Sequence, residues 1–141
     1  MDWRALLLSP NGRIRRGEFW TGFALVMATS VAVNLFQSGV SHVLGLVLLW
    51  PQVCIHAKRL HDIGRSAWLL LVPFSVSLIA LAVIILNSGP ALFVDGAGDG
   101  TLTTAACLVV MVLDGVGFLS WVGLSAGDPE ANRYGPPRDP V

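Results

Sequence analysis

The sequence predicts an all-α polytopic membrane protein with four transmembrane helices in two hairpins and both termini in the cytoplasm. Of its 141 residues, 54% are hydrophobic and 13% are charged, against about 25% charged in an average soluble domain. Four apolar stretches follow one another along the chain. All nine lysine and arginine residues fall outside these stretches and on the same side of the resulting topology.

The predicted spans belong to a single membrane domain, 1–141, and cover about residues 19–36, 40–56, 67–86 and 101–124. A helix needs roughly 17–25 residues to cross the hydrocarbon core, so the second span is marginal, and whether it crosses fully stays open. Residues 37–39 suffice for a tight helical hairpin, with Gly39 free to adopt the left-handed conformation. One continuous helix would bury Asn34, Gln37 and His42 in a very long span, so the hairpin is favoured.

The distribution of charge predicts the orientation. The N-terminal segment 1–18 carries four basic residues, the hairpin 57–66 carries three and the tail 125–141 carries two. The connections around residues 37–39 and 87–100 carry none. Basic residues accumulate on the cytoplasmic side of inner-membrane proteins. We therefore expect segments 1–18, 57–66 and 125–141 to be cytoplasmic.

One carboxylate, Asp114, lies near the middle of a predicted span. An ionised side chain there costs at least about 2.5–3.5 kcal/mol on insertion scales. Ser77 and Thr29 are candidate partners at a comparable depth. We expect a protonated Asp114 that donates a hydrogen bond between helices, and a proton or cation site is the alternative.

The hairpin 57–66 is the densest polar segment of the chain. Asp62 is three residues from both Arg59 and Arg65, so one helical turn would let it pair with both. His56 and His61 are five residues apart, whereas helical metal-binding pairs are usually four apart. The glycine-rich segment 95–100 lacks the closing glutamate of a calcium loop. We therefore expect no metal and no cofactor.

The sequence offers no support for catalysis or for nucleic-acid binding. It contains no G-x-S-x-G or H-E-x-x-H motif and no phosphate-cradling glycine loop. Nine basic and nine acidic residues give a formal net charge of zero, so no bulk electrostatic attraction to nucleic acid is expected. We expect the protein not to be an enzyme.

Three segments together resemble a known family. They read G-R-I-R-R-G-E-F-W at 12–20, K-R-L-H-D-I-G-R-S-A-W at 58–68 and N-R-Y-G at 132–135. Their order and spacing resemble domain-of-unknown-function family 805, small bacterial inner-membrane proteins of about this length. The resemblance covers nearly the whole chain. It implies a polytopic inner-membrane protein and brings no catalytic residues.

All three segments fall on the predicted cytoplasmic side, and we expect them to meet in one polar cluster. The expected ion pairs are Glu18 with Arg65, and Asp62 with Arg13 or Arg16. The full set of candidate residues is Arg13, Arg16, Glu18, Arg59, His61, Asp62, Arg65, Asn132 and Tyr134.

The predicted function is that of a non-enzymatic inner-membrane protein whose polar cluster binds anionic lipid headgroups or a protein partner. The protein partner would be another membrane protein or a second copy of this chain. The alternative is a subunit of a small oligomeric transporter or channel that uses Asp114. An intramembrane enzyme that uses His56 or His61 is the least favoured reading.

Overall fold

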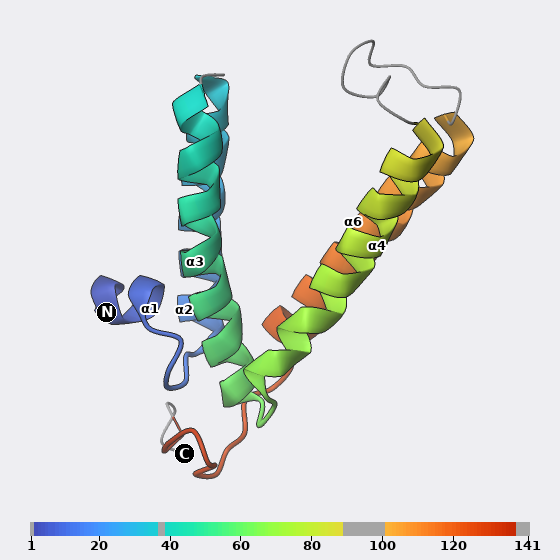
Figure 1. Ribbon diagram of the computed structural model, residues 1–141. Coiled ribbons are helices and arrows are strands. Elements are labelled where there is room, and N and C mark those ends of the chain that lie inside the picture. The colour runs from blue at the N-terminus through green and yellow to red at the C-terminus, as the bar shows by residue number, and fades with distance from the viewer. Residues whose placement is uncertain (1, 37–38, 89–100, 138–141) are drawn as a thin grey trace. The chain divides into compact units, whose positions relative to one another are not determined.

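The computed structural model describes residues 2–36, 39–88 and 101–137, whose regular structure is helical (Figure 1). The helices are α1 (Trp3–Leu8), α2 (Arg16–Leu35), α3 (Gly39–Asp62), the 3₁₀ helix η1 (Ala67–Leu70), α4 (Leu71–Ser88) and α6 (Thr101–Leu124). The chain divides into two compact units. Unit 1 is Met1–Leu70 with Val122–Val141, and unit 2 is Leu71–Trp121. The connection at 37–38 and the glycine-rich segment 95–100 lie outside the described residues.

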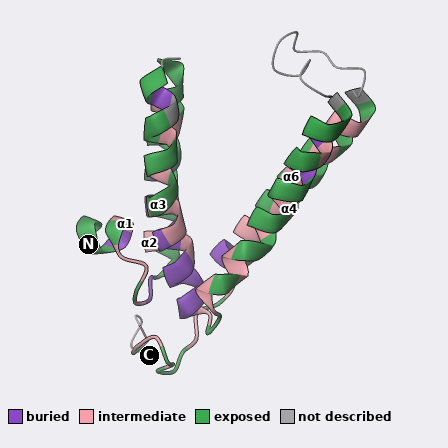
Figure 2. Cartoon of the chain, viewed as in Figure 1, coloured by how far each residue is buried: buried purple, intermediate pink, exposed green. Residues whose placement is uncertain are grey.

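Four helical segments are long and apolar enough to cross a membrane: Arg16–Leu35, Gly39–Asp62, Ala67–Asn87 and Leu102–Leu124. They have 20 to 24 residues, which at about 1.5 Å per residue matches the roughly 30 Å of a hydrocarbon core. At most 24% of the apolar window of any of them is buried inside the protein. Their exposed surfaces (green in Figure 2) are rich in Leu, Val and Ile. This is the surface of an all-helical protein built for an apolar surrounding.

The observed helix ends differ from the predicted span ends mainly in α3. That helix runs to Asp62, six residues beyond the predicted boundary at residue 56. Residues 57–62 of the expected hairpin are therefore its last turns, and only 63–66 connect it to η1. The charged residues suggested a boundary, but they continue the helix because their side chains find partners around its end. With 24 residues, α3 no longer has the marginal length expected of the second span.

A glycine stops α3 where the sequence could not place its end. Gly64 has a φ of +73°, in the left-handed region that only glycine enters without strain. The N–H of Gly64 donates to the carbonyl of His61 at 3.1 Å, and the N–H of Arg65 donates to the carbonyl of Leu60 at 2.8 Å. These two bonds form a Schellman motif, which satisfies the last carbonyls of a helix.

Two other helices begin with recognisable local chemistry. The Glu18 carboxylate accepts a hydrogen bond from the backbone N–H of Arg15 at 3.0 Å, which anchors the first turn of α2. The third membrane-length segment starts as the 3₁₀ helix η1 and becomes α-helical at Leu71. Pro73 then lies in the first turn of α4, where its missing N–H removes no intrahelical bond.

In unit 1, α2 and α3 are separate helices that pack against each other, and α1 packs on α3. Gly22 of α2 allows the close approach: a Cβ there would lie 3.2 Å from both Ile55 Cδ1 and Leu6 Cδ2. The Phe19 ring meets the His56 ring edge-on at 5.2 Å. Phe19 and Ile55 are fully buried. The packing of α2 on α3 supports the predicted hairpin over one continuous helix.

Unit 2 consists of α4 and most of α6, and it buries much less. Among its described residues, Ala80 and Ile84 of α4 are the buried hydrophobic ones. In α6, the apolar window of Leu102–Leu124 is only 6% buried. A Cβ added at Gly115 or Gly117 would meet nothing within 4 Å. The unit therefore exposes nearly all its apolar surface and depends on its surroundings to cover it.

Candidate functional site

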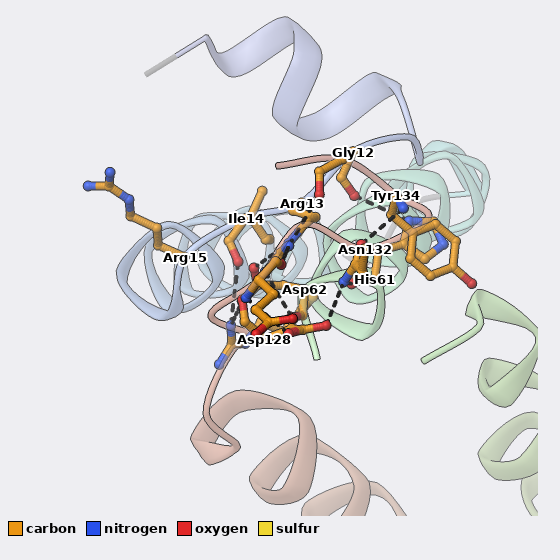
Figure 3. Close-up of polar contacts among 12 residues, drawn as sticks. Gly12, Arg13, Ile14, Arg15, His61, Asp62, Asp128, Asn132 and Tyr134 are labelled. Carbon is orange, nitrogen blue, oxygen red and sulfur yellow. Dashed lines mark hydrogen bonds and ion pairs between the residues drawn. The ribbon is translucent and has the colours of Figure 1, made fainter. Parts of the chain in front are cut away.

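The carboxylate of Asp62 holds two buried guanidinium groups at the C-terminal end of α3 (Figure 3). Its Oδ1 accepts from Arg13 Nε at 3.0 Å, and its Oδ2 accepts from Arg59 Nη1. All three side chains are almost completely buried, with 7% of the Asp62 side chain exposed and less of the arginines. Such charge-assisted bonds are stronger than neutral ones, and removing one partner leaves a buried charge.

The remaining N–H groups of Arg13 donate hydrogen bonds to backbone carbonyls. Nη1 donates to Glu130 at 2.8 Å and to Gly135 at 3.3 Å, both in the C-terminal tail. Nη2 donates to the carbonyls of Asp62, at 3.3 Å, and of Asp128. One side chain from the segment before α2 thus binds α3 and three points of the tail.

Arg59 binds the end of α6 in the same way, by donating hydrogen bonds to backbone carbonyls. Nε donates to the carbonyl of Val122 at 3.1 Å, Nη2 to that of Ser125, and Nη1 to that of Ile14 at 3.5 Å. Arg59 is 1% exposed, and the five guanidinium N–H groups suit several acceptors held in one plane. A cation at the last carbonyls of a helix also complements the helix dipole.

The tail is fixed to α3 by a second set of contacts. The Tyr134 ring stacks on the His61 ring at 3.8 Å, with 10° between the planes. The Asn132 side-chain amide donates to the His61 carbonyl at 3.0 Å, and the Asp128 N–H donates to the Asp62 carbonyl at 2.7 Å. A Cβ on Gly127 would collide with the Asp62 carboxylate. Backbone therefore lies directly against the charged centre.

We name the polar cluster by these residues: Arg13, Arg59, His61, Asp62, Asp128, Asn132 and Tyr134. The structure brings together six of the nine predicted residues and places the expected Asp62–Arg13 pair at 3.0 Å. Arg16 lies at its edge, where Nε donates to the Ser125 carbonyl at 3.0 Å. Three segments far apart in sequence meet here, since the bonds of Arg13 join residues 49 to 122 positions away.

The expected pair between Glu18 and Arg65 is not formed within residues 2–36, 39–88 and 101–137. Glu18 instead caps α2, and Arg65 is exposed. The expected bond between Asp62 and Arg65 is also absent from the described part of the chain, because α3 ends between them and Arg13 takes the carboxylate. Local spacing predicted the Asp62–Arg65 bond, and the expected meeting of the three segments predicted the Glu18–Arg65 pair, but tertiary contacts decided both.

Sequence reasoning missed two participants. Lys58 is buried, and its ammonium donates to the carbonyls of Ala5 and Leu6, which holds α1 on α3. Asp128 begins the tail's contacts through its own backbone atoms. The turn signal Gly127-Asp128-Pro129 marked this place. Carbonyl acceptors have no residue-type signature, so no pattern could identify them as partners of the arginines.

The polar cluster has the chemistry of a structural tie. Its guanidinium donors are directed at carboxylate and carbonyl oxygens, and its central side chains are buried. The part of the chain that the structure describes contains no group of three or more His, Cys, Asp or Glu residues that could hold a metal ion.

Asp114 is half-buried in α6, within unit 2. Its Oδ2 atom is buried and has no hydrogen-bond partner among the described residues. The hydroxyl of Thr29, one proposed partner, donates to the Leu25 carbonyl of its own helix at 2.8 Å. No hydrogen bond from Ser77 to Asp114 is present in the described ranges.

The fold and the site define a class: small all-helical proteins with four membrane-length helices and an arginine–aspartate cluster that ties the N-terminal segment to the tail. The family model described as "Protein of unknown function (DUF805)" matches residues 7–136. The chain belongs to this family, as its sequence motifs indicated.

Two relatives show the same extent of similarity. The chain is 31% identical over 136 residues to the "Uncharacterized protein YiiR" of Escherichia coli strain K12, and equally to its counterpart in Escherichia coli O157:H7. The alignments cover 92% of this chain and 85% of each relative. No solved structure matches the chain.

Replacing Asp62 with Asn should destabilise unit 1 by about 3–5 kcal/mol, because two buried guanidinium groups lose their only shared carboxylate. Thermal unfolding in detergent measures the loss. Glu130→Gln removes the same charge from an exposed side chain and serves as the matched control. Equal unfolding midpoints for both variants would contradict the central role of Asp62.

Proposed function

We propose that the protein is a non-enzymatic, multi-pass protein of the bacterial inner membrane, with both termini in the cytoplasm. Its cytoplasmic face binds the headgroups of anionic phospholipids. The polar cluster gives that face its shape, and exposed arginines around the cluster make the contact.

The observation that carries this proposal is the excess of positive charge in unit 1. Its described residues include eight basic and five acidic side chains, whereas those of unit 2 include only Asp114. Arg13 and Arg59 are buried beside one buried carboxylate, that of Asp62, and Lys58 is buried with its ammonium on carbonyls of α1. Five further arginines are exposed: Arg4, Arg15, Arg16, Arg65 and Arg133. Each basic side chain near an anionic leaflet contributes about 1 kcal/mol to binding.

The contacts of the polar cluster support the proposed topology. Arg13 bonds to the tail, so the segment before α2, the end of α3 and the tail must share one compartment. An even number of crossings must therefore separate the N-terminal segment from the tail. Because these segments carry the basic residues, the positive-inside rule assigns that compartment to the cytoplasm.

A reporter fused after Val141 tests this topology. We expect alkaline phosphatase in that position to be inactive and green fluorescent protein to be fluorescent, since the first needs the periplasm and the second the cytoplasm. The same two reporters after Asn87, which ends the third membrane-length segment, should give the opposite pattern and control for expression. An active phosphatase after Val141 would refute the proposed orientation.

The headgroup proposal predicts which lipids accompany the protein. The protein is purified from nanodiscs that contain one part phosphatidylglycerol to four parts phosphatidylcholine. The lipid that copurifies with it should contain a higher proportion of phosphatidylglycerol than the nanodiscs do. The triple variant Arg4→Gln, Arg65→Gln, Arg133→Gln should remove most of the enrichment, because three arginines at about 1 kcal/mol each amount to roughly a hundred-fold in affinity. Asp2→Asn with Glu130→Gln removes exposed acids and should raise it. Copurifying lipid with the same composition as the nanodiscs would contradict the proposal, as would a bound protein partner in place of lipid.

A second candidate function follows from Asp114. A buried carboxylate oxygen in a membrane-length helix, without a hydrogen-bond partner among the described residues, points to a proton or cation path. Four helices are too few to enclose such a path alone, so this function requires an oligomer.

Asp114→Asn decides between the two functions. If the protein transports protons or cations, the variant should lose flux in proteoliposomes while keeping wild-type expression. Cys107→Ala, two turns away on the same helix, is the control and should keep its flux. Identical fluxes for wild type, both variants and empty vesicles would eliminate transport.

A further inference from the structure

Two guanidinium groups donate to the same backbone carbonyl, that of Ser125: one belongs to Arg16 at the start of α2 and the other to Arg59 of α3. Arg16 Nε donates to the Ser125 carbonyl at 3.0 Å, and Arg59 Nη2 donates to the same oxygen. A carbonyl carries only a partial negative charge, so it offsets little of the two full positive charges. Arg59 is buried, whereas Arg16 is exposed.

The carboxylates near this point are already engaged. Asp62 is shared by Arg13 and Arg59, and Glu18 caps the backbone of α2. Within the described residues, no ion pair joins Arg16 to a carboxylate. The surroundings of Arg16 therefore carry an excess of positive charge that the protein does not neutralise there.

Arg16 also presents unused donors in a fixed orientation. Its Nη1 and Nη2 atoms make no hydrogen bond with any residue in the described ranges, while its Nε bond holds the guanidinium plane. Two parallel N–H groups of one guanidinium match the spacing of two oxygens of a phosphate. The Nε bond lowers the entropic cost of binding because part of the side chain is already ordered.

The position along α2 suits a lipid headgroup. Arg16 is the first residue of a membrane-length helix, and Trp20 follows one turn later on the same face. Trp20 packs over Gly123, where a Cβ would lie 2.5 Å from its ring. Trp20 is 37% exposed, and tryptophan is the side chain typical of the headgroup level. The free edge of Arg16 therefore lies where phosphates are found.

We propose that Arg16, held by Ser125 and beside Arg59, binds the phosphate of an anionic phospholipid such as phosphatidylglycerol. The second guanidinium disfavours the ammonium group of a zwitterionic headgroup, which gives the site its preference for net negative charge. This inference rests on the proposed headgroup binding and deepens it by assigning one lipid to one residue.

Native mass spectrometry of the detergent-solubilised protein tests this site. The full chain is titrated with phosphatidylglycerol, with phosphatidylcholine, and with phosphatidylglycerol in the presence of excess inorganic phosphate. Wild-type protein should bind one phosphatidylglycerol tightly, and excess phosphate should not displace it. Arg16→Gln should weaken this first binding step about fifty-fold, because it loses the general attraction of one arginine, about five-fold, and one bidentate charge-assisted contact, about ten-fold.

Two further variants control for charge and folding. Arg4→Gln removes an exposed arginine of α1 and should weaken the first binding step about five-fold, the loss of general attraction alone. Arg16→Lys keeps the charge without the paired donors and should weaken binding less than Arg16→Gln. If Arg16→Gln unfolds at a lower temperature than wild type, the affinity of Arg16→Lys replaces it as the test of the site.

The outcomes separate the inference from the proposed function. Equal losses for Arg16→Gln and Arg4→Gln would leave general headgroup attraction intact and overturn the specific site, as would unchanged affinity in Arg16→Lys. Displacement by inorganic phosphate would also overturn it, because the ligand would then be a free anion. No preference of the wild-type protein for phosphatidylglycerol over phosphatidylcholine would refute the proposed function itself.

Discussion

The architecture of unit 1 depends on a buried carboxylate between two buried guanidinium groups. The Asp62 carboxylate pairs with Arg13 and Arg59, and each of these arginines extends the contact to other segments. Arg13 brings in the tail, and Arg59 brings in the end of α6. Because a buried charge without its partner is costly, the three side chains act together. Through them, the N-terminal segment, α3 and the tail acquire fixed relative positions.

This interaction is suited to helices that are long and apolar enough to cross a membrane. Acyl chains are as apolar as leucine, so apolar packing alone gives membrane helices little preference for one another. Unit 1 supplements its close packing at Gly22 with directional bonds at the helix ends. Unit 2 has a mainly apolar surface and a single described charge, Asp114. Unit 1 thus combines close apolar packing with directional polar contacts at its helix ends.

The sequence predicted what composition and spacing determine. The apolar stretches identified four membrane-length helices, and the basic motifs identified most residues of the polar cluster. It could not predict how far α3 continues, because that depends on the Schellman turn at Gly64 and on partners for its charged side chains. It predicted that Asp62 pairs with Arg13 or Arg16, but it could not decide between these two arginines or exclude Arg65. Choices among chemically equivalent partners are made by tertiary structure, which local spacing does not record.

A formal net charge of zero conceals a strong separation of charge. The described part of unit 1 holds eight basic and five acidic side chains, and four of the nine acidic residues lie elsewhere in the chain: Asp95, Asp99, Asp114 and Asp139. Charges in water at 0.1 M salt are screened over about 10 Å, a distance shorter than a membrane is thick. A headgroup therefore responds to the nearby face and not to the total. For that reason, the balanced composition that argues against nucleic-acid binding is fully compatible with a basic face directed at anionic lipid.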